Sequence, residues 1–377
     1  MKGKLIISFV LLSLICSAQT GNTPTKKKQY ISIATDYYQG NILPTTDFVK
    51  GDNLSGKPIK DYQSASIKVL WQNPGYTDWQ KVYRCPYVGV GTSLGNFYNL
   101  KEIGLPVSHF GILGIPVFRT KYFDLYSEFQ YGLAWGWKYY NPVSNPKNLV
   151  IGGRLTVHTA GEVLGVIHLS KNFDLGTGLS FIHFSNGGFE RPNRGFNIYS
   201  PSVELKYHFS ERAELKNISR PGRLARYNEF FVMAGYGDHQ QVEHELDSNY
   251  FAIIGLSLIY FDQLSNAFRL GLGSDLNYWM GLTALPDGTI GPRNFDNLTI
   301  GLIAQPEFII DKVKLVGGFG IYARHLKYGN FKQTYQRLGV KYEFYKNLSV
   351  GVNIRAINFV DAEFFEFNIA YSFKHYK

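Results

Sequence analysis

The chain has 377 residues, with 39 Lys and Arg against 29 Asp and Glu, giving a formal net charge of +10. Aromatic residues make up 16% of the sequence and charged residues only 18%, which excludes a disordered or nucleic-acid-wrapping chain. A bundle of membrane helices would need repeated long apolar runs and a positive mean hydropathy, but the value is −0.15. The 39 Gly, 27 Tyr and 28 Phe residues favour many strands and turns instead.

The N-terminus has the pattern of a secretory signal peptide. Lys2 and Lys4 precede a short apolar run, and small residues occupy the positions just before Gln19. This pattern predicts a signal peptide over residues 1–18, cleaved after Ala18. A membrane anchor helix is the alternative, although the apolar run is short for one. The exported chain would keep a single cysteine, Cys85, so it could form no intramolecular disulfide.

Strand-like segments follow one another from residue 30 to the C-terminus. Most are longer than the strands of globular proteins, and they suit a tilted membrane strand of about 9–11 residues. Several alternate polar and apolar residues, most cleanly at residues 341–345. The sequence predicts sixteen strands, at 30–38, 64–72, 82–93, 106–118, 123–137, 153–169, 173–185, 196–209, 227–238, 249–262, 266–279, 297–309, 312–324, 334–345, 347–358 and 364–374.

The connections between these segments are alternately short and long. Short turns such as 170–172 and 311–312 separate long loops such as 39–63, 138–152 and 186–195. This alternation is typical of an outer-membrane barrel with short periplasmic turns and long external loops. Strands can span a membrane only as a closed barrel, because every backbone group must be paired. We therefore predict an all-β, antiparallel transmembrane barrel in the bacterial outer membrane; a soluble β-sandwich is the alternative.

One charged connection, residues 210–226, breaks the alternation and separates residues 19–209 from residues 227–377. The second part could enlarge one barrel or form a second barrel of eight strands. We favour one barrel of about 14–16 strands over an eight-stranded barrel with additional strands. Long hairpins extend an existing sheet without creating new edges. A barrel of that size would enclose a lumen.

The segment 181–197 carries the residues that suggest chemistry. In the strand that leads into it, the even positions are mostly small or polar and suit the barrel interior, so His183 and Ser185 face the lipid. An imidazole and a hydroxyl on that face cost desolvation energy, and barrel folding does not require them. A base beside a hydroxyl is the minimal unit for nucleophilic ester cleavage.

A third residue could orient the imidazole. Asn197 is the polar exception on the lipid-facing side of the returning strand, and an amide oxygen can accept the imidazole N–H and fix its tautomer. The backbone amides of Gly187 and Gly188, or the side chain of Asn186, could hold the oxyanion. The same residues also fit a histidine at the membrane interface followed by an ordinary turn.

The motif at residues 183–188, followed by that at 192–195, resembles the lipid A 3-O-deacylase (PagL-type) family. Its members are acyloxyacyl hydrolase-like outer-membrane barrels that remove an acyl chain from lipopolysaccharide. The resemblance implies His183 as general base and Ser185 as nucleophile, with Asn193 among the residues that position the substrate. That family has a Glu twelve residues after the serine, where this chain has Asn197. The resemblance covers residues 30–209 at most, and residues 227–374 are expected to lie outside it.

The triad itself resembles that of outer-membrane phospholipase A. That enzyme also has His-x-Ser-Asn-Gly on its barrel exterior, with an Asn twelve residues after the serine, the position of Asn197 here. It ligates calcium through an Arg three residues after the serine, where this chain has Gly188, so the resemblance leaves calcium dependence open.

Together these patterns predict an outer-membrane esterase that removes an acyl chain from lipid A by a Ser/His/Asn mechanism. Hydrolysis of a glycerophospholipid is the first alternative, and a non-catalytic barrel acting as a pore or surface-interaction protein is the second. The expected partner is lipid A, as part of lipopolysaccharide, or a phospholipid. We expect no cofactor, no metal and no nucleic acid, and the sequence leaves the oligomeric state open.

Overall fold

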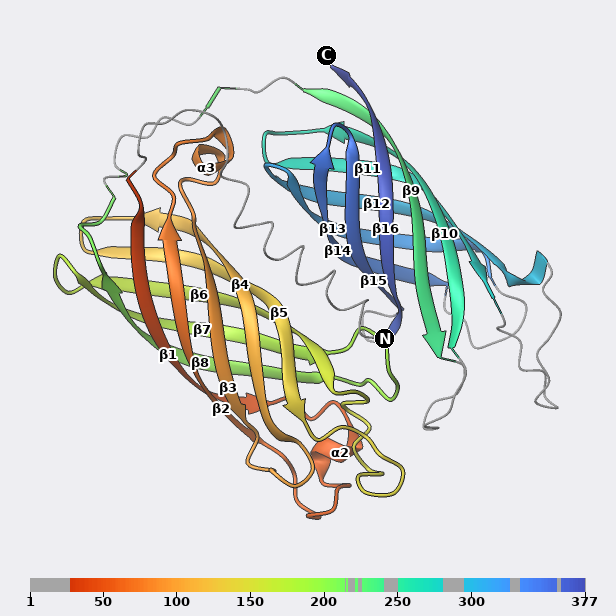
Figure 1. Ribbon diagram of the computed structural model, residues 1–377, viewed down its shortest axis with the longest axis horizontal. Coiled ribbons are helices and arrows are strands. Elements are labelled where there is room, and N and C mark those ends of the chain that lie inside the picture. Colours follow the sequence, from red (N-terminus) through yellow and green to blue (C-terminus); the bar gives the residue numbers. More distant parts are fainter. Residues whose placement is uncertain are drawn as a thin grey trace. The chain divides into compact units, whose positions relative to one another are not determined.

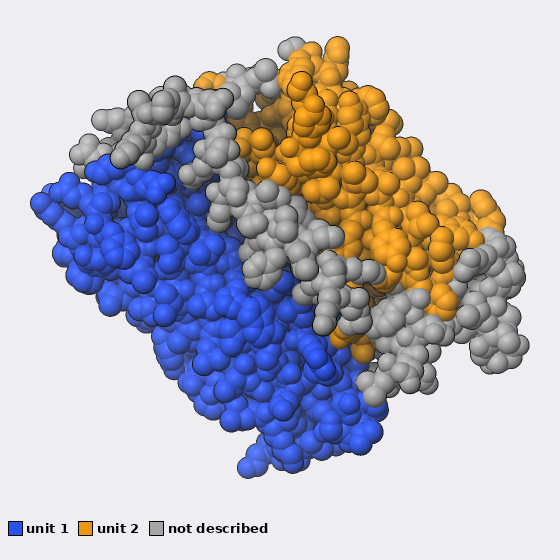
Figure 2. Space-filling view, in the orientation of Figure 1, with its two compact units in different colours: residues 1–186, 192–221 blue, residues 187–191, 222–377 orange. Residues whose placement is uncertain are grey.

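The computed structural model describes residues 28–213, 215, 221–222, 226–240, 250–280, 295–325, 333–357 and 361–376. The expected signal peptide and most of the loops expected at 239–248, 280–296 and 325–333 lie outside the described residues. Within these ranges, no helix is both long and apolar enough to cross a membrane. Contacts divide the chain into two compact units, residues 1–186 with 192–221 and residues 187–191 with 222–377 (Figure 2).

The first eight strands form one closed antiparallel barrel, drawn in red to green in Figure 1. Strand β1 pairs with β2 on one side and with β8 on the other, which closes the sheet. Two short helices, α2 (Asp47–Lys50) and α3 (Asp78–Val82), lie in its connections. The strands are β1 (Tyr30–Ile42), β2 (Asp61–Gln72), β3 (Tyr87–Asn96), β4 (Gly104–Arg119), β5 (Phe123–Trp137), β6 (Leu155–His168), β7 (Phe173–Ser185) and β8 (Phe196–His208).

The last eight strands form a second closed antiparallel barrel, in which β9 pairs with both β10 and β16. A single 3-10 turn, η1 (Phe295–Asn297), precedes β12 among the described residues. The strands are β9 (Tyr227–Gln240), β10 (Tyr250–Gln263), β11 (Phe268–Trp279), β12 (Leu298–Ile310), β13 (Val313–Arg324), β14 (Thr334–Tyr345), β15 (Leu348–Ile357) and β16 (Asp361–Tyr376).

The all-β antiparallel barrel prediction is confirmed, but the preference for one enlarged barrel is wrong. In each set of eight strands the first strand pairs with the last, so neither sheet has an unpaired edge strand. The large lumen expected for a sixteen-stranded barrel is therefore absent as well. An eight-stranded barrel has an interior just wide enough to be filled by side chains.

Sixteen strands occur in the described residues, close to the predicted positions, with one clear error near residue 82. The sequence predicts a strand over 82–93, whereas α3 ends at Val82 and β3 begins at Tyr87. The helix forms because Thr77 and Gln80 make a capping box and Asp78 lies in the first turn. Cys85, in the next turn, is free and buried, and burial raises the pKa of its thiol.

The interior of the first barrel has a buried charged layer between two hydrophobic clusters. The Lys68 ammonium lies 3.0 Å from Asp36, 3.1 Å from Glu128 and 2.8 Å from Glu204. Such a buried cation is tolerated because several carboxylates compensate its charge. One cluster, which includes Phe97, lies toward the ends of the strands that carry the long loops, here called the outer end. The other lies nearer the short-turn end.

Candidate active site

The structure places the His183 and Ser185 side chains on the outward face of β7, as predicted. Inward residues Ile182 and Phe184 are 3% and 1% exposed, whereas His183 and Ser185 are half-buried. This alternation follows from the two-residue period of a strand. Across the β7–β8 ladder His183 is directly opposite Asn197, whose side chain has the same half-buried, outward position.

The three side chains form a continuous hydrogen-bonded chain. His183 Nε2 lies 2.9 Å from Ser185 Oγ, and His183 Nδ1 lies 2.7 Å from Asn197 Oδ1. Asn197 Oδ1 can only accept, so Nδ1 carries the proton and Nε2 is left as a lone pair directed at the serine hydroxyl. This is the tautomer that a general base needs for removing the serine proton.

An aromatic cluster inside the barrel supports this part of the wall. Phe184 and Phe196, the inward neighbours of the triad residues, are almost completely buried. The ring centroid of Phe184 lies 5.2 Å from that of Trp137, and the centroid of Phe196 lies 4.6 Å from that of Phe97. Edge-to-face and tilted ring contacts of this kind hold side chains in fixed rotamers. The backbone that carries the triad therefore rests on a rigid base.

Gly195 makes the close approach of the triad possible, a role that the sequence motif alone does not reveal. Its φ is +69°, in the left-handed region, and an added Cβ would lie 3.0 Å from His183 Cε1 and 3.3 Å from the Ser185 Cβ. The Gly195 amide donates to the Val150 carbonyl at 3.1 Å, so the 138–152 loop fixes this position. Its place in the 192–195 motif draws attention to the residue, but its contact with His183 follows only from the structure.

The residues predicted to hold the oxyanion are only partly brought together. The Asn186 amide donates to Asn193 Oδ1 at 2.8 Å, which joins the two ends of the loop after Ser185. Gly187 and Gly188 have left-handed φ values of +67° and +83°, as a tight turn requires. Both belong to the second compact unit, and their part in the site stays a prediction. Among the described residues, no group of three or more His, Cys, Asp or Glu side chains could hold a metal.

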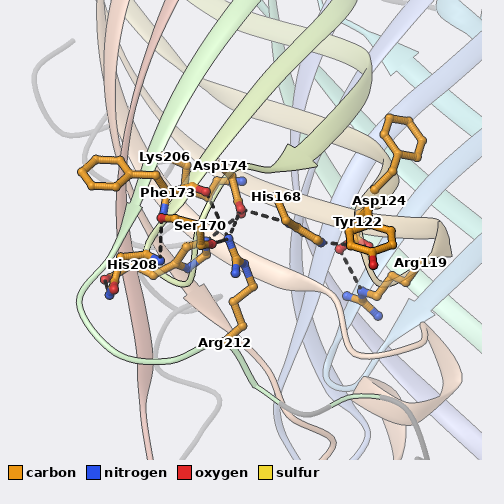
Figure 3. A network of polar contacts seen from close by, with 12 residues as sticks. Arg119, Tyr122, Asp124, His168, Ser170, Phe173, Asp174, Lys206, His208 and Arg212 are labelled. Atoms are coloured by element: carbon orange, nitrogen blue, oxygen red, sulfur yellow. Dashed lines mark hydrogen bonds and ion pairs between the residues drawn. The ribbon is translucent and has the colours of Figure 1, made fainter.

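A second polar cluster lies at the short-turn end of the first barrel, far along the strands from the triad. Figure 3 shows His168 between two carboxylates, 2.9 Å from Asp174 and 3.5 Å from Asp124. His208 also contacts Asp174, at 2.7 Å, and Arg212 binds the same carboxylate. The cluster lines a cavity of about 860 Å³. Because its charged groups pair mainly with one another, we interpret it as the closure of this barrel end.

Two models of known protein families match the chain. Residues 65–206 match the model of lipid A 3-O-deacylase (PagL), and residues 228–375 match that of the acyloxyacyl hydrolase C-terminal domain. The fold and these matches define the class as outer-membrane β-barrel hydrolases that act on an ester. The chain belongs to the PagL-type family of lipid A 3-O-deacylases. The expectation that the second half lies outside the family resemblance is therefore wrong.

Comparisons with curated proteins and with solved structures add little to the family assignment. No curated protein sequence matches the chain. Solved structures that match the chain include the Pseudomonas putida toluene transporter TodX (9% identity, 94% of this chain, 91% of that chain, TM-score 0.18). They also include a Rhodopseudomonas blastica porin triple mutant (6%, 92% and 100%, TM-score 0.18) and Acinetobacter baumannii Omp33 (7%, 92% and 99%, TM-score 0.17). TM-scores this low carry no argument about this chain.

Proposed function

We propose that the first barrel is a lipid A 3-O-deacylase that uses Ser185 as nucleophile, His183 as general base and Asn197 as the residue that orients the imidazole. The observation that carries the proposal is the Ser185–His183–Asn197 hydrogen-bonded chain on the outward face of the barrel. An outward-facing triad reaches an ester only where lipid contacts the wall, so the substrate is a membrane lipid. The family match gives lipid A as that lipid.

The reaction follows from the positions of these groups. The Ser185 hydroxyl attacks the ester carbonyl carbon while its proton passes to His183 Nε2. His183 then returns this proton to the departing 3-hydroxyl oxygen of the sugar, leaving the fatty acyl group on Ser185. Water, deprotonated by the same imidazole, hydrolyses the acyl-enzyme. Throughout, Asn197 Oδ1 accepts the Nδ1 proton and so keeps Nε2 available.

The oxyanion requires donors on the other side of the carbonyl. Asn193 Oδ1 already accepts the Asn186 amide, which leaves the Asn193 Nδ2 group free to donate toward the reacting carbonyl. We assign the oxyanion position to the Asn193 side-chain amide. Fixed donors aimed at developing negative charge typically contribute about 10²–10³-fold in rate.

Glycerophospholipid hydrolysis is the second candidate, and Asn197 is the observation that favours it, because outer-membrane phospholipase A has Asn at this position. A non-catalytic barrel is the third possibility. The test is to incubate purified wild type and Ser185→Ala with lipid A and with phospholipid, and to read both acyl patterns by mass spectrometry.

Loss of one ester-linked hydroxyacyl chain from lipid A, absent with Ser185→Ala, supports the deacylase. Release of lysophospholipid supports the phospholipase. If folded wild-type protein changes neither lipid, the catalytic proposal is wrong.

A further inference from the structure

The outward wall beside the triad carries a patch of polar side chains that includes no cation, here called the amide patch. It extends from β8 across β1 to β2 at the outer end of the first barrel. In the ladders, Tyr199 pairs with Asn41, and Asn41 with Asp61. Tyr199 is also two residues from Asn197 on the same face, so the patch is continuous with the triad. The patch consists of Gln39, Asn41, Asp61, Gln63 and Tyr199.

Height on the barrel does not explain the patch. The outer ends of β4, β5 and β6 lie on the other side of the triad, and their outward residues are mostly apolar, with His109 on β4 and Thr159 on β6 as the exceptions. Leu105 and Trp135 are 42% and 38% exposed, and Val157 lies at the outer end of β6 with the same outward orientation. If the patch only matched the polar layer at the membrane surface, these strands should carry as many outward polar residues as β1 and β2. The wall is therefore less polar on this side of Ser185 than on the side of the amide patch.

Two tyrosines organise the amides of the patch. The Tyr37 hydroxyl donates to Gln39 Oε1 at 2.9 Å, and the Tyr98 hydroxyl donates to Gln63 Oε1 at 2.5 Å. Because phenols occupy the carbonyl oxygens, the Nε2 groups of both glutamines are left as donors on the barrel surface. Leaving such groups toward hydrocarbon would cost free energy, so a polar partner on this wall is expected.

The chemistry of the patch suits a sugar better than a phosphate. Its members supply amide donors, one phenol and the Asp61 carboxylate, and none of the five is cationic. Hydroxyl and amide groups of a sugar pair with amide, phenol and carboxylate groups, whereas phosphate recognition relies on Arg or Lys. On the opposite side, Leu179 and Phe181 are 59% and 48% exposed on the wall of β7 below the triad, a surface suited to an acyl chain.

We propose that the amide patch binds the sugar head of the glycolipid substrate, so that its ester linkage lies at Ser185 and the acyl chain runs along β7 and β6. This inference rests on the proposed function. It assigns substrate orientation to outward residues of β1 and β2 that lie outside the catalytic motif. The head group would be recognised by hydrogen bonds to amide, phenol and carboxylate groups, which distinguish a glycolipid from a glycerophospholipid.

The test replaces Gln39, Asn41 and Gln63 together by leucine, with Thr35→Val, deeper on the same face of β1, as control. Leucine suits a lipid-facing position, so the barrel should fold. We expect kcat/KM for lipid A to fall roughly 10²-fold, at about fivefold for each lost hydrogen bond, mainly through KM. Hydrolysis of a p-nitrophenyl fatty acyl ester, which has no sugar head, should stay unchanged.

Equilibrium binding of lipid A to Ser185→Ala protein, with and without the three leucines, separates this inference from the proposed function. Weaker lipid A binding with the leucines supports the patch even if wild type proves inactive. Equal binding, or an equal loss of rate on lipid A and on the p-nitrophenyl ester, overturns it. If wild type cleaves neither substrate, the proposed function fails independently of the patch.

Discussion

The two barrels of this chain share one architecture but differ in what their walls carry. Both close with eight antiparallel strands, and both fill their interiors with paired charges. In the first barrel one cation, Lys68, is surrounded by three carboxylates, whereas in the second one carboxylate, Asp275, lies 2.9 Å from Arg337 and 2.8 Å from Arg355. Paired charges therefore fill the interior of both narrow barrels, and their presence does not indicate an active site.

The outward faces distinguish the barrels. The first carries His183, Ser185 and Asn197 on its wall, with the amide patch beside them. The second has no His-x-Ser sequence anywhere in residues 227–377, and exposed residues of its described wall, such as Leu256, Leu272 and Leu338, are apolar. Placing a polar group toward lipid costs desolvation free energy. A polar group on the outward face therefore indicates function more reliably than a polar group in the barrel interior.

Removing the nucleophile should have the largest effect. Ser185→Ala should lower the rate of lipid A deacylation by roughly 10⁴-fold or more, because no other group can form the acyl-enzyme. Mass spectrometry of lipid A gives the rate. Ser127→Ala changes a serine on the outward face of β5 in the same way and should keep wild-type activity. Equal activity of Ser185→Ala and wild type would show that the triad is not used.

Substitutions in the interior charge layers should distinguish the roles of the two barrels. Lys68→Met leaves the buried carboxylates of Asp36 and Glu128 without their cation, whereas Glu204 still pairs with Lys206. Arg337→Met removes one of two cations from Asp275. Each should lower the free energy of unfolding by about 3–5 kcal/mol. Only Lys68→Met should also reduce lipid A deacylation, because only the first barrel carries the triad.

Unfolding in urea, followed by the shift of the folded band on gels, measures stability. Loss of activity in folded Arg337→Met protein would mean that the second barrel takes part in the reaction.

Adding one methyl group at Gly195 should disturb the triad without unfolding the barrel. The new Cβ would press on the His183 ring and would strain a left-handed φ, so we expect about a 10²-fold loss of kcat, as for a misplacement of about 1 Å. Gly317→Ala is the matched strand variant, since its nearest neighbour would be at an ordinary 3.5 Å. Similar activities of the two variants would remove Gly195 from the site.

The third triad residue should give the smallest effect. Asn197→Ala removes the acceptor for His183 Nδ1, and we expect a loss of roughly 10-fold to 10²-fold, because both tautomers become accessible. Asn197→Asp keeps an acceptor at the same distance and should retain more activity than Asn197→Ala. The order of kcat/KM values among wild type, Asp and Ala variants tests the role. An alanine variant as active as wild type would contradict it.

The sequence by itself determined most of the strands and their facing, and it predicted the three residues of the candidate triad. A two-residue alternation assigns His183 and Ser185 to the outward face, and the hydrogen bonds of the structure join His183 to Ser185 and to Asn197. Long strands with alternate short and long connections were enough for the barrel class. These features depend on local patterns, and the sequence of one strand and of the next strand along the chain is enough to predict them.

Only the tertiary structure decided how the strands close and what supports the site. Closure depends on whether β8 returns to β1, a pairing between residues far apart in the chain that no local pattern encodes. The same holds for the approach of Gly195 to His183, for the loop carbonyl of Val150 that fixes it, and for the amide patch that β1 and β2 bring beside β8. Each joins segments that are distant in sequence, and their proximity is a property of the closed barrel.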